Sequence, residues 1–171
     1  MMENTEDRTL IRVPAGEGKG FSVAGANLTW KVRSDDAEGE LCLFEQIVEP
    51  GEGVPLHTHS YPEAFYVVSG AIHFVSSAAS DEGWDCKSGD VVIARPHTPH
   101  GFFNQGTDTA RMLSISVAAH ERFFHAVEDA DRQEPFGMLP PDAAFARVIA
   151  IGAQTDTHFL PPLPDDTAPK K

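Results

Sequence analysis

The sequence predicts an all-β sandwich or barrel followed by two short helices. Between residues 27 and 118, short runs of Val, Ile, Phe, Leu and Thr alternate with clusters of Gly, Pro, Asp and Ser at the spacing of all-β domains. After Ala118 the apolar residues recur at helical spacing instead. At 171 residues the chain suits one domain with tails, because this length builds a single hydrophobic core.

The expected strands follow one another closely along this region. The stretch EAFYVVSGAIHFVSS predicts two strands joined by a tight turn at Ser69 and Gly70. The segment AASDEGW, residues 78–84, predicts an exposed loop. The remaining strands are predicted at NLTWKV (27–32), LCLFEQIVE (41–49), GDVVIA (89–94), HGFFN (100–104) and RMLSISVA (111–118).

Two helices are predicted at HERFFHAVEDA (120–130) and DAAFARVIAIG (142–152). Asp142 is expected to cap the start of the second, and Gly152 is expected just past its end. The Pro-rich segment from Phe159 onward builds no regular structure. The chain therefore divides into a lead-in at 1–26, open to strand exchange, a β unit at 27–118, and helices with a tail at 119–171.

Charge and composition exclude several classes of function. The formal net charge is −13 and no Lys/Arg cluster occurs, so neither nucleic acid nor an anionic membrane is an expected partner. The start MMENTEDRTL has no apolar core, and no run approaches 18 apolar residues, so neither a secretion signal nor a membrane span is expected. The two cysteines form no C-x-x-C pair, which favours the reducing cytoplasm.

One segment, PGEGVPLHTHSYPEAFYVVSG at 50–70, carries a set of candidate metal ligands. His57 and His59 are two residues apart and therefore project to the same face of a strand. Glu63 has the same parity, and His100 lies in a second segment, RPHTPHGFFN. Three imidazoles and a carboxylate suit a first-row divalent metal and leave positions open for substrate. The alternative is a polar strand face that binds no ion.

The same parity argument defines a candidate substrate pocket. It aims Phe65 and Val67 inward beside Glu63, and Phe102 and Asn104 accompany His100. An apolar, aromatic cavity beside a metal would accept a flat hydrophobic molecule and keep bulk water out. Packing in the core is the alternative role for the three apolar residues.

These residues resemble the motifs of the cupin family. The first cupin motif, G-x5-H-x-H-x3-E-x6-G, is matched at Gly51, His57, His59, Glu63 and Gly70. The second, G-x5-P-x-G-x2-H-x3-N, is matched at Gly89, His100 and Asn104, with Arg95 and His97 in place of proline and glycine.

The departure at His97 leaves the ligand position intact and puts the turn before it in doubt. His97 is either a turn residue with a ring in solvent, or a donor near the metal or substrate. His73 is expected at the surface or hydrogen-bonded, Tyr61 is expected in a loop at the rim, and His120, His125 and His158 fall outside the motifs.

Over roughly residues 10–163 the chain looks like single-domain cupins similar to quercetin dioxygenase. The resemblance implies a jelly-roll barrel and one divalent metal (Fe, Mn, Ni, Co, Cu or Zn) held by His57, His59, Glu63 and His100. It implies a dioxygenase of flavonol-like or other enolisable compounds, in which Glu63 takes the enol proton and dioxygen cleaves the ring with loss of carbon monoxide. It also implies a homodimer that pairs through the N-terminal RTLIRV. Metal-dependent isomerase or lyase chemistry and non-catalytic binding of a small molecule remain the alternatives.

Overall fold

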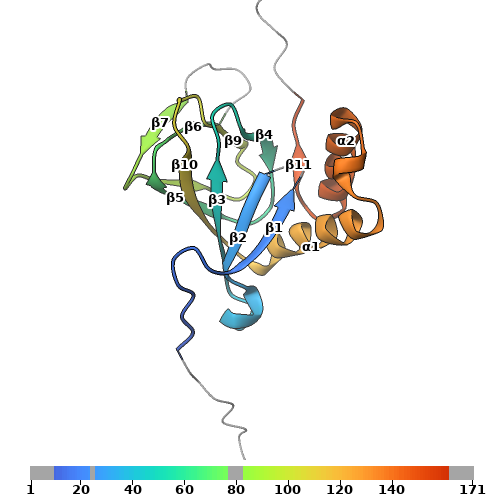
Figure 1. Ribbon diagram of the computed structural model, residues 1–171, viewed down its shortest axis with the longest axis horizontal. Coiled ribbons are helices and arrows are strands. Elements are labelled where there is room, and N and C mark those ends of the chain that lie inside the picture. Colours follow the sequence, from blue (N-terminus) through green and yellow to red (C-terminus); the bar gives the residue numbers. More distant parts are fainter. Residues whose placement is uncertain (1–9, 24–25, 77–82, 162–171) are drawn as a thin grey trace, which may run out of the picture.

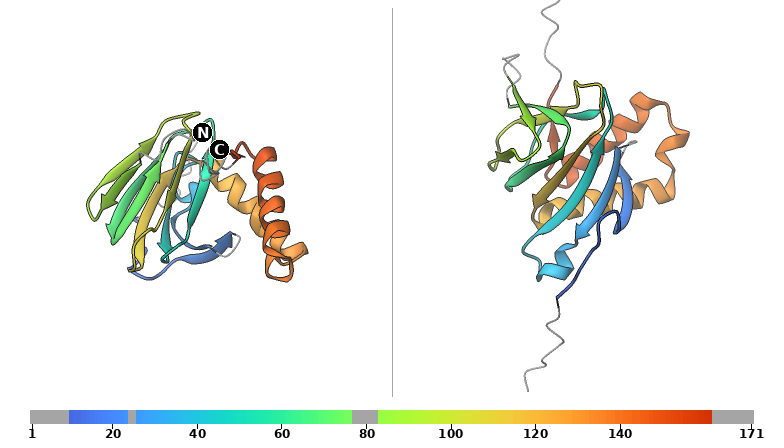
Figure 2. Two further views of the ribbon diagram at one scale, coloured as in Figure 1. Left: turned by 90° about the horizontal axis from the view of Figure 1, so that it is seen from above. Right: turned by 60° about the vertical axis from the view of Figure 1, so that its left-hand side comes forward.

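Two β-sheets packed face to face, with two helices against one side, make up the computed structural model (Figures 1 and 2). It describes residues 10–23, 26–76 and 83–161. Most of the loop predicted at 78–84 and of the Pro-rich tail lies outside these residues. In the part of the chain that is described, no helix is both long and apolar enough to cross a membrane.

Eleven strands in the described residues form the two sheets. The six-stranded sheet contains, in spatial order, β1 (Lys19–Val23), β2 (Ala26–Val32), β3 (Cys42–Val48), β10 (Ala110–Ser116), β5 (Glu63–Ser69) and β8 (Val91–Ala94). The five-stranded sheet contains β11 (His158–Phe159), β4 (Gly53–Thr58), β9 (His100–Phe103), β6 (Ala71–Val75) and β7 (Trp84–Lys87). This arrangement confirms the all-β jelly-roll class. Across the described residues the sheets are not closed into a continuous barrel.

Gly70 forms the turn between β5 and β6, two strands that lie in different sheets. Gly70 has a φ of +76°, which glycine adopts without a steric penalty, and it separates β5 from β6. The predicted tight turn is confirmed, and the two strands that it joins do not pair with each other. β5 lies between β10 and β8, whereas β6 lies between β9 and β7 of the other sheet. The chain therefore crosses between sheets here, as it also does between β4 and β5.

Lys19–Val23, which the sequence placed in the lead-in, forms β1. It pairs with β2 in antiparallel register from Lys19 opposite Trp30 to Val23 opposite Ala26, and Phe21 is buried. Gly18 before this strand and Gly20 within it interrupt the alternation of apolar and polar residues, so the sequence did not predict the strand. The preceding residues Leu10 to Val13 are exposed and belong to no strand.

Both predicted helices are present, as α1 (Ala118–Gln133) and α2 (Pro141–Gln154), with short 3-10 turns at Ser34–Ala37 and Phe136–Met138. The ends predicted for α2 are wrong. Pro141 starts the helix, a position where its missing N–H costs nothing, and Asp142 lies inside the first turn.

Gly152 lies within α2 rather than after it. A Cβ at this position would come 2.5 Å from the carbonyl oxygen of Thr157. The residue is therefore glycine because the chain returns closely against the helix, and not because the helix ends there.

Two clusters of buried apolar side chains fill the interior. One lies between the sheets and is built from Val48, Phe65, Val67, Ile72, Phe74, Cys86, Ala94, Phe102, Ala110 and Met112. The other joins β1, β2 and β3 to the helices and is built from Phe21, Leu28, Trp30, Cys42, Phe44, Phe123, Phe124, Val127, Phe136, Ala144 and Val148. Contacts of His100 with Phe65 and of His120 with Phe44 connect the candidate site to both clusters.

Candidate metal centre

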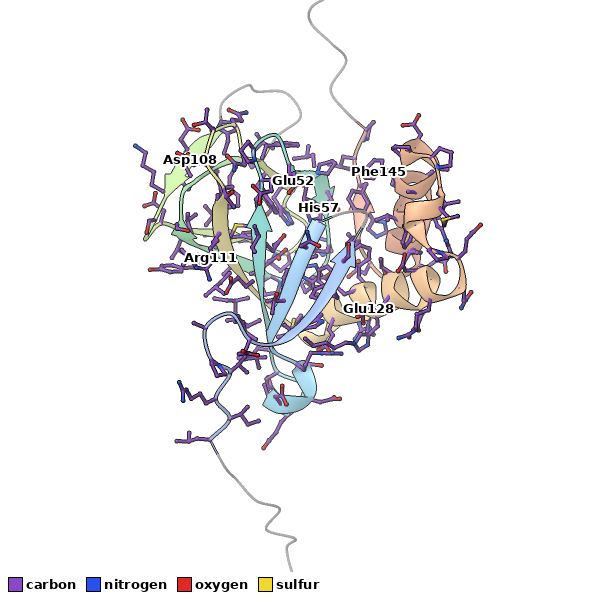
Figure 3. All side chains as sticks on the ribbon, in the orientation of Figure 1. Glu52, His57, Asp108, Arg111, Glu128 and Phe145 are labelled. Atoms are coloured by element: carbon purple, nitrogen blue, oxygen red, sulfur yellow. The ribbon has the colours of Figure 1, made fainter. Side chains whose placement is uncertain are left out.

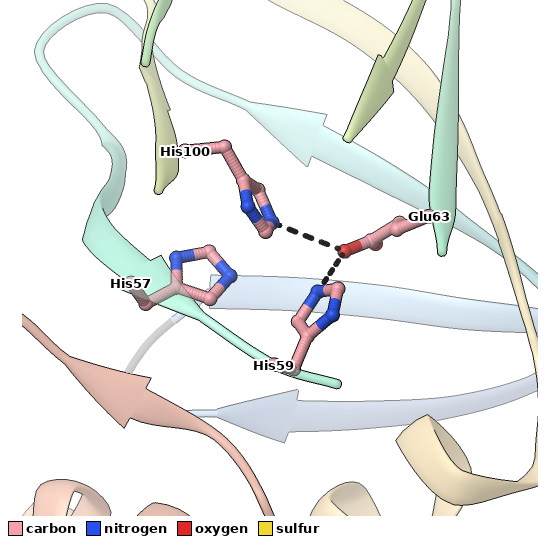
Figure 4. A group of neighbouring side chains, drawn as sticks. All are labelled: His57, His59, Glu63 and His100. Carbon is pink, nitrogen blue, oxygen red and sulfur yellow. Dashed lines mark hydrogen bonds and ion pairs between the residues drawn. The ribbon is translucent and has the colours of Figure 1, made fainter. Parts of the chain in front are cut away.

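The four predicted ligands meet at the place where the two sheets face each other (Figure 4). His57 on β4 lies directly opposite His100 on β9, because the two strands pair in that register. His59 follows β4 in the loop that crosses to the other sheet, and Glu63 begins β5 there. One ligand atom from each residue lies within 4.8 Å of all the others, and all four residues are buried.

Each histidine is held by a hydrogen bond from its other ring nitrogen. Nδ1 of His57 contacts the carbonyl oxygen of Pro55 at 2.9 Å, Nδ1 of His59 that of Tyr61 at 2.7 Å, and Nδ1 of His100 that of Thr98 at 2.9 Å. A carbonyl only accepts, so each Nδ1 carries the hydrogen. In the neutral imidazole each Nε2 then offers a lone pair to the centre, as metal-binding histidines do.

This arrangement brings acceptors together and calls for a cation between them. Oε2 of Glu63 lies 3.2 Å from Nε2 of His59 and 3.6 Å from Nε2 of His100 (Figure 4). Nε2 of His100 is buried and has no hydrogen-bond partner in the part of the chain that the structure describes. Carboxylate and imidazole lone pairs repel unless a proton or a metal ion lies between them. A mixed N/O set of this kind fits a divalent first-row metal, so the residues present suit the ion that the sequence predicts.

The surroundings keep these ligands in the charge states that metal binding needs. Burial lowers the pKa of His57 to about 3, and His100 beside it acts in the same direction, so His57 is neutral at ordinary pH. Burial alone raises the pKa of Glu63, but His120, His100 and His59 around it hold the value below its ordinary range. Glu63 is therefore an ionised carboxylate.

A fourth histidine, His120, completes the surroundings of Glu63, and the motifs did not identify it. It lies in the first turn of α1, is buried, and places Nδ1 3.6 Å from Oε1 of Glu63. Burial lowers the pKa of His120 to about 4. One sequence signal was available: His120, Phe123, Phe124 and Val127 share the 3- and 4-residue spacing of a buried helix face.

A cavity of about 510 Å³ opens beside the four ligands. His57 and Glu63 lie in its wall together with His120, so the candidate metal centre faces it. Figure 3 labels three residues of the lining, Glu52 and His57 near β4 and Phe145 on α2. About half of the apolar side chains in the wall are aliphatic, and the others are Phe44, Phe65, Phe102, Phe103, Phe123, Phe124, Phe145 and Phe159.

The predicted substrate residues separate into two groups. Phe65 and Phe102 line the cavity and remain candidate substrate contacts. Val67 and Asn104 are buried but are not part of its lining. Asn104 donates to the carbonyl oxygens of Val48 and Asp108 and accepts from the backbone N–H of Gly106, so its polar groups hold the loop after β9.

His97 is a turn residue. Its φ of +62° is the conformation expected where the second motif has glycine, its side chain is exposed, and its backbone N–H donates to the carbonyl of His59 at 2.7 Å. His73 bonds to Asp85, as expected of a histidine outside the site.

Tyr61 is buried rather than set at an open rim. Its ring stacks on His59 with centroids 4.0 Å apart, and its hydroxyl lies 3.3 Å from that of Thr157. The stacking adds a second constraint on the orientation of the His59 ring.

Comparisons with known proteins agree with this fold. Residues 44–116 match the family model described as a cupin domain. Among solved structures, the chain is similar to the polyketide cyclase RemF from Streptomyces resistomycificus, with 22% identity over 64% of this chain and 80% of that chain and a TM-score of 0.57. It is also similar to a predicted oxalate decarboxylase from Thermotoga maritima, with 19% identity over 63% of this chain and 98% of that chain and a TM-score of 0.55.

A cupin-like protein from Thermotoga maritima has 19% identity over 67% of this chain and 84% of that chain, with a TM-score of 0.50. No curated protein matches the sequence. At these identities the similarity establishes the fold and not the reaction. The fold is that of a cupin domain.

Proposed function

We propose that this cupin domain is a metal-dependent dioxygenase of flavonol-like or other enolisable aromatic small molecules. The observation that supports it is the meeting of two features in one place. One ligand atom from each of three histidines and from Glu63 lies within 4.8 Å of the others, and two of these residues, His57 and Glu63, line a cavity whose wall includes eight phenylalanines. A flat, apolar molecule that carries an acidic hydroxyl fits such a cavity better than a small polar acid does.

His57, His59, Glu63 and His100 would hold the metal. The bound ion supplies positive charge that stabilises an enolate and a site where dioxygen reacts. Glu63 accepts the enol proton at Oε1, the oxygen that does not face His59 and His100. The phenylalanines orient the ring system and exclude bulk water. For a flavonol the balance is one flavonol and one O₂ giving one phenolic ester and one carbon monoxide, with O₂ as the oxidant.

Oxygen consumption tests this proposal. The protein is stripped of metal, reloaded separately with Fe(II), Mn(II), Co(II), Ni(II) or Cu(II), and mixed with quercetin in an oxygen electrode. We expect uptake of one O₂ and release of one carbon monoxide per quercetin with at least one metal. We expect no O₂ uptake and no release of carbon monoxide with the metal-free protein.

Bound metal without oxygen uptake on any flavonol would contradict the dioxygenase. Anaerobic turnover of an enolisable compound would then favour an isomerase or lyase, and binding without turnover would favour a non-catalytic role. The aromatic lining argues for the dioxygenase before these two, because small polar substrates need a more polar wall.

We further propose that the protein is a homodimer, and the outer face of the six-stranded sheet supports this. Neighbouring strands place Ile115, Ala64 and Ile93 in one row and Leu113, Tyr66 and Val91 in the next. Val91 and Ile93 are 58% and 65% exposed and lie on the edge strand β8.

A second copy is the partner that the charges favour. The chain carries a net charge of −13, yet Glu45, the acid beside these two rows, is paired with Lys31 and Arg111. Two copies can therefore meet on this face without bringing unpaired acids together.

Sedimentation velocity checks the dimer. We expect the protein to sediment as a dimer at micromolar concentration and the Val91→Lys/Ile93→Lys variant to sediment as a monomer with unchanged metal content. A wild-type monomer at these concentrations would contradict the proposal.

A further inference from the structure

We propose that His120 is a positioning residue that donates a hydrogen bond from Nδ1 to Oε1 of Glu63 and so fixes which carboxylate oxygen faces the metal. The inference rests on the metal centre of the proposed function but not on the dioxygenase reaction. Oε2 of Glu63 faces His59 and His100, and Oε1 faces His120. The two oxygens of one carboxylate thus have different neighbours.

Among residues 10–23, 26–76 and 83–161, Nδ1 of His120 has no hydrogen-bond partner. It is buried without a hydrogen bond, and Oε1 lies 3.6 Å away, slightly beyond hydrogen-bonding distance. A buried N–H without an acceptor is costly, and a small rotation of either side chain closes this gap. Metal binding draws the carboxylate to one orientation, and an N–H that bonds the outer oxygen holds it there.

Aromatic neighbours limit the directions in which the His120 ring can point. Its centroid lies 4.6 Å from that of Phe124, 5.3 Å from that of Tyr61 and 5.7 Å from that of Phe44. These three rings restrict rotation of the His120 ring, and the rest of its surroundings includes the cavity that it lines.

The first turn of α1 is itself anchored. Glu121, the next residue, accepts hydrogen bonds from the guanidinium of Arg33 and from the backbone N–H of Ser34, the latter at 2.7 Å. These contacts attach the helix to the connection between β2 and β3. Helix α1 therefore holds His120 at a fixed distance from Glu63.

The donor and the ring can be separated by substitution. His120→Asn keeps an N–H donor near the position of Nδ1 but loses the ring. His120→Phe keeps the ring but loses the donor. His73→Asn is the matched control, because it makes the same chemical change at a histidine that bonds Asp85 and is not part of the cavity lining.

The test is the affinity and absorption spectrum of bound Co(II), measured by chelator competition on all four proteins. We expect His120→Phe to bind Co(II) 10–100-fold more weakly with altered ligand-field bands. We expect His120→Asn to stay within about threefold of the wild type with its spectrum, and His73→Asn to be unchanged. If His120→Asn does not fold, the test is the Co(II) affinity of His120→Phe, which preserves the packing, compared with that of His73→Asn.

Two results would overturn the inference alone. Wild-type affinity and spectrum in His120→Phe would show that no donor is needed, and equal losses in His120→Phe and His120→Asn would show that the imidazole acts in some other way. A wild-type protein that binds no Co(II) would overturn the metal centre and this inference together. Absence of flavonol turnover in a protein that binds Co(II) would contradict the proposed dioxygenase reaction and not the role of His120.

Discussion

The His57→Ala/His59→Ala variant should bind no stoichiometric divalent metal while it keeps its fold. Two of the four ligands are removed, and each ligand contributes about a quarter of a binding free energy of roughly 12 kcal/mol. Losing about 6 kcal/mol corresponds to roughly a 10⁴-fold weaker affinity. Elemental analysis after gel filtration measures the metal, and circular dichroism checks the fold.

The fold should survive because the two histidines belong to the site and not to the hydrophobic clusters. Neither is part of the buried apolar clusters between the sheets or under the helices. Removing them also relieves the crowding of lone pairs around Glu63 in the metal-free protein. His97→Ala/His73→Ala, with two histidines outside the ligand set, is the matched control and should retain its metal. Stoichiometric metal in the His57→Ala/His59→Ala variant would show that the ion binds elsewhere.

The cluster of four candidate ligands could be predicted from the sequence because its geometry is local. Strand period two places His57 and His59 together, and a short crossing returns the chain at Glu63. Only the pairing of His57 with His100 is long-range, and the two motifs encode it through their spacing. Such a site follows from a few dozen residues of the chain.

His120 could not be found in the same way, because tertiary packing alone brings it to Glu63. It is 57 residues further along the chain, on a helix whose direction depends on its anchoring through Glu121 and on the aromatic cluster beneath it. Its helical spacing indicated burial but not the identity of its neighbour. The end of α2 shows the same limit, since Gly152 looked like a terminator and serves a contact with Thr157.

Metal-free protein should lose stability steeply as the pH falls from about 6.5 to 4. Burial is the main cause that lowers the pKa of His57 to about 3 and that of His120 to about 4, whereas an unfolded histidine takes up a proton near pH 6.5. The unfolded state therefore binds more protons than the folded state throughout this interval. The free energy of unfolding decreases as the pH is lowered. Together the two residues remove roughly 6 kcal/mol by pH 4.

That loss is comparable to the whole stability of an ordinary domain, so acid unfolding should set in near pH 4. Glu63 adds to it below about pH 4.5, because its pKa is also lower in the folded state than in the unfolded state. Urea titrations at several pH values in the presence of a chelator measure the effect, with the buried Trp30 as a fluorescent probe. A free energy of unfolding that is constant from pH 7 to 4 would contradict this electrostatic account.

Substitution and metal separate the contributions. His57→Ala should flatten the curve between pH 6.5 and 4 by about 3 kcal/mol, because the depressed group is gone. Bound metal should raise stability at neutral pH by mass action, because it binds the folded state and not the unfolded state. The difference between the loaded and metal-free curves is then the metal's own contribution at each pH. Equal stability of the loaded and metal-free protein at neutral pH would show that the folded chain does not bind the ion preferentially.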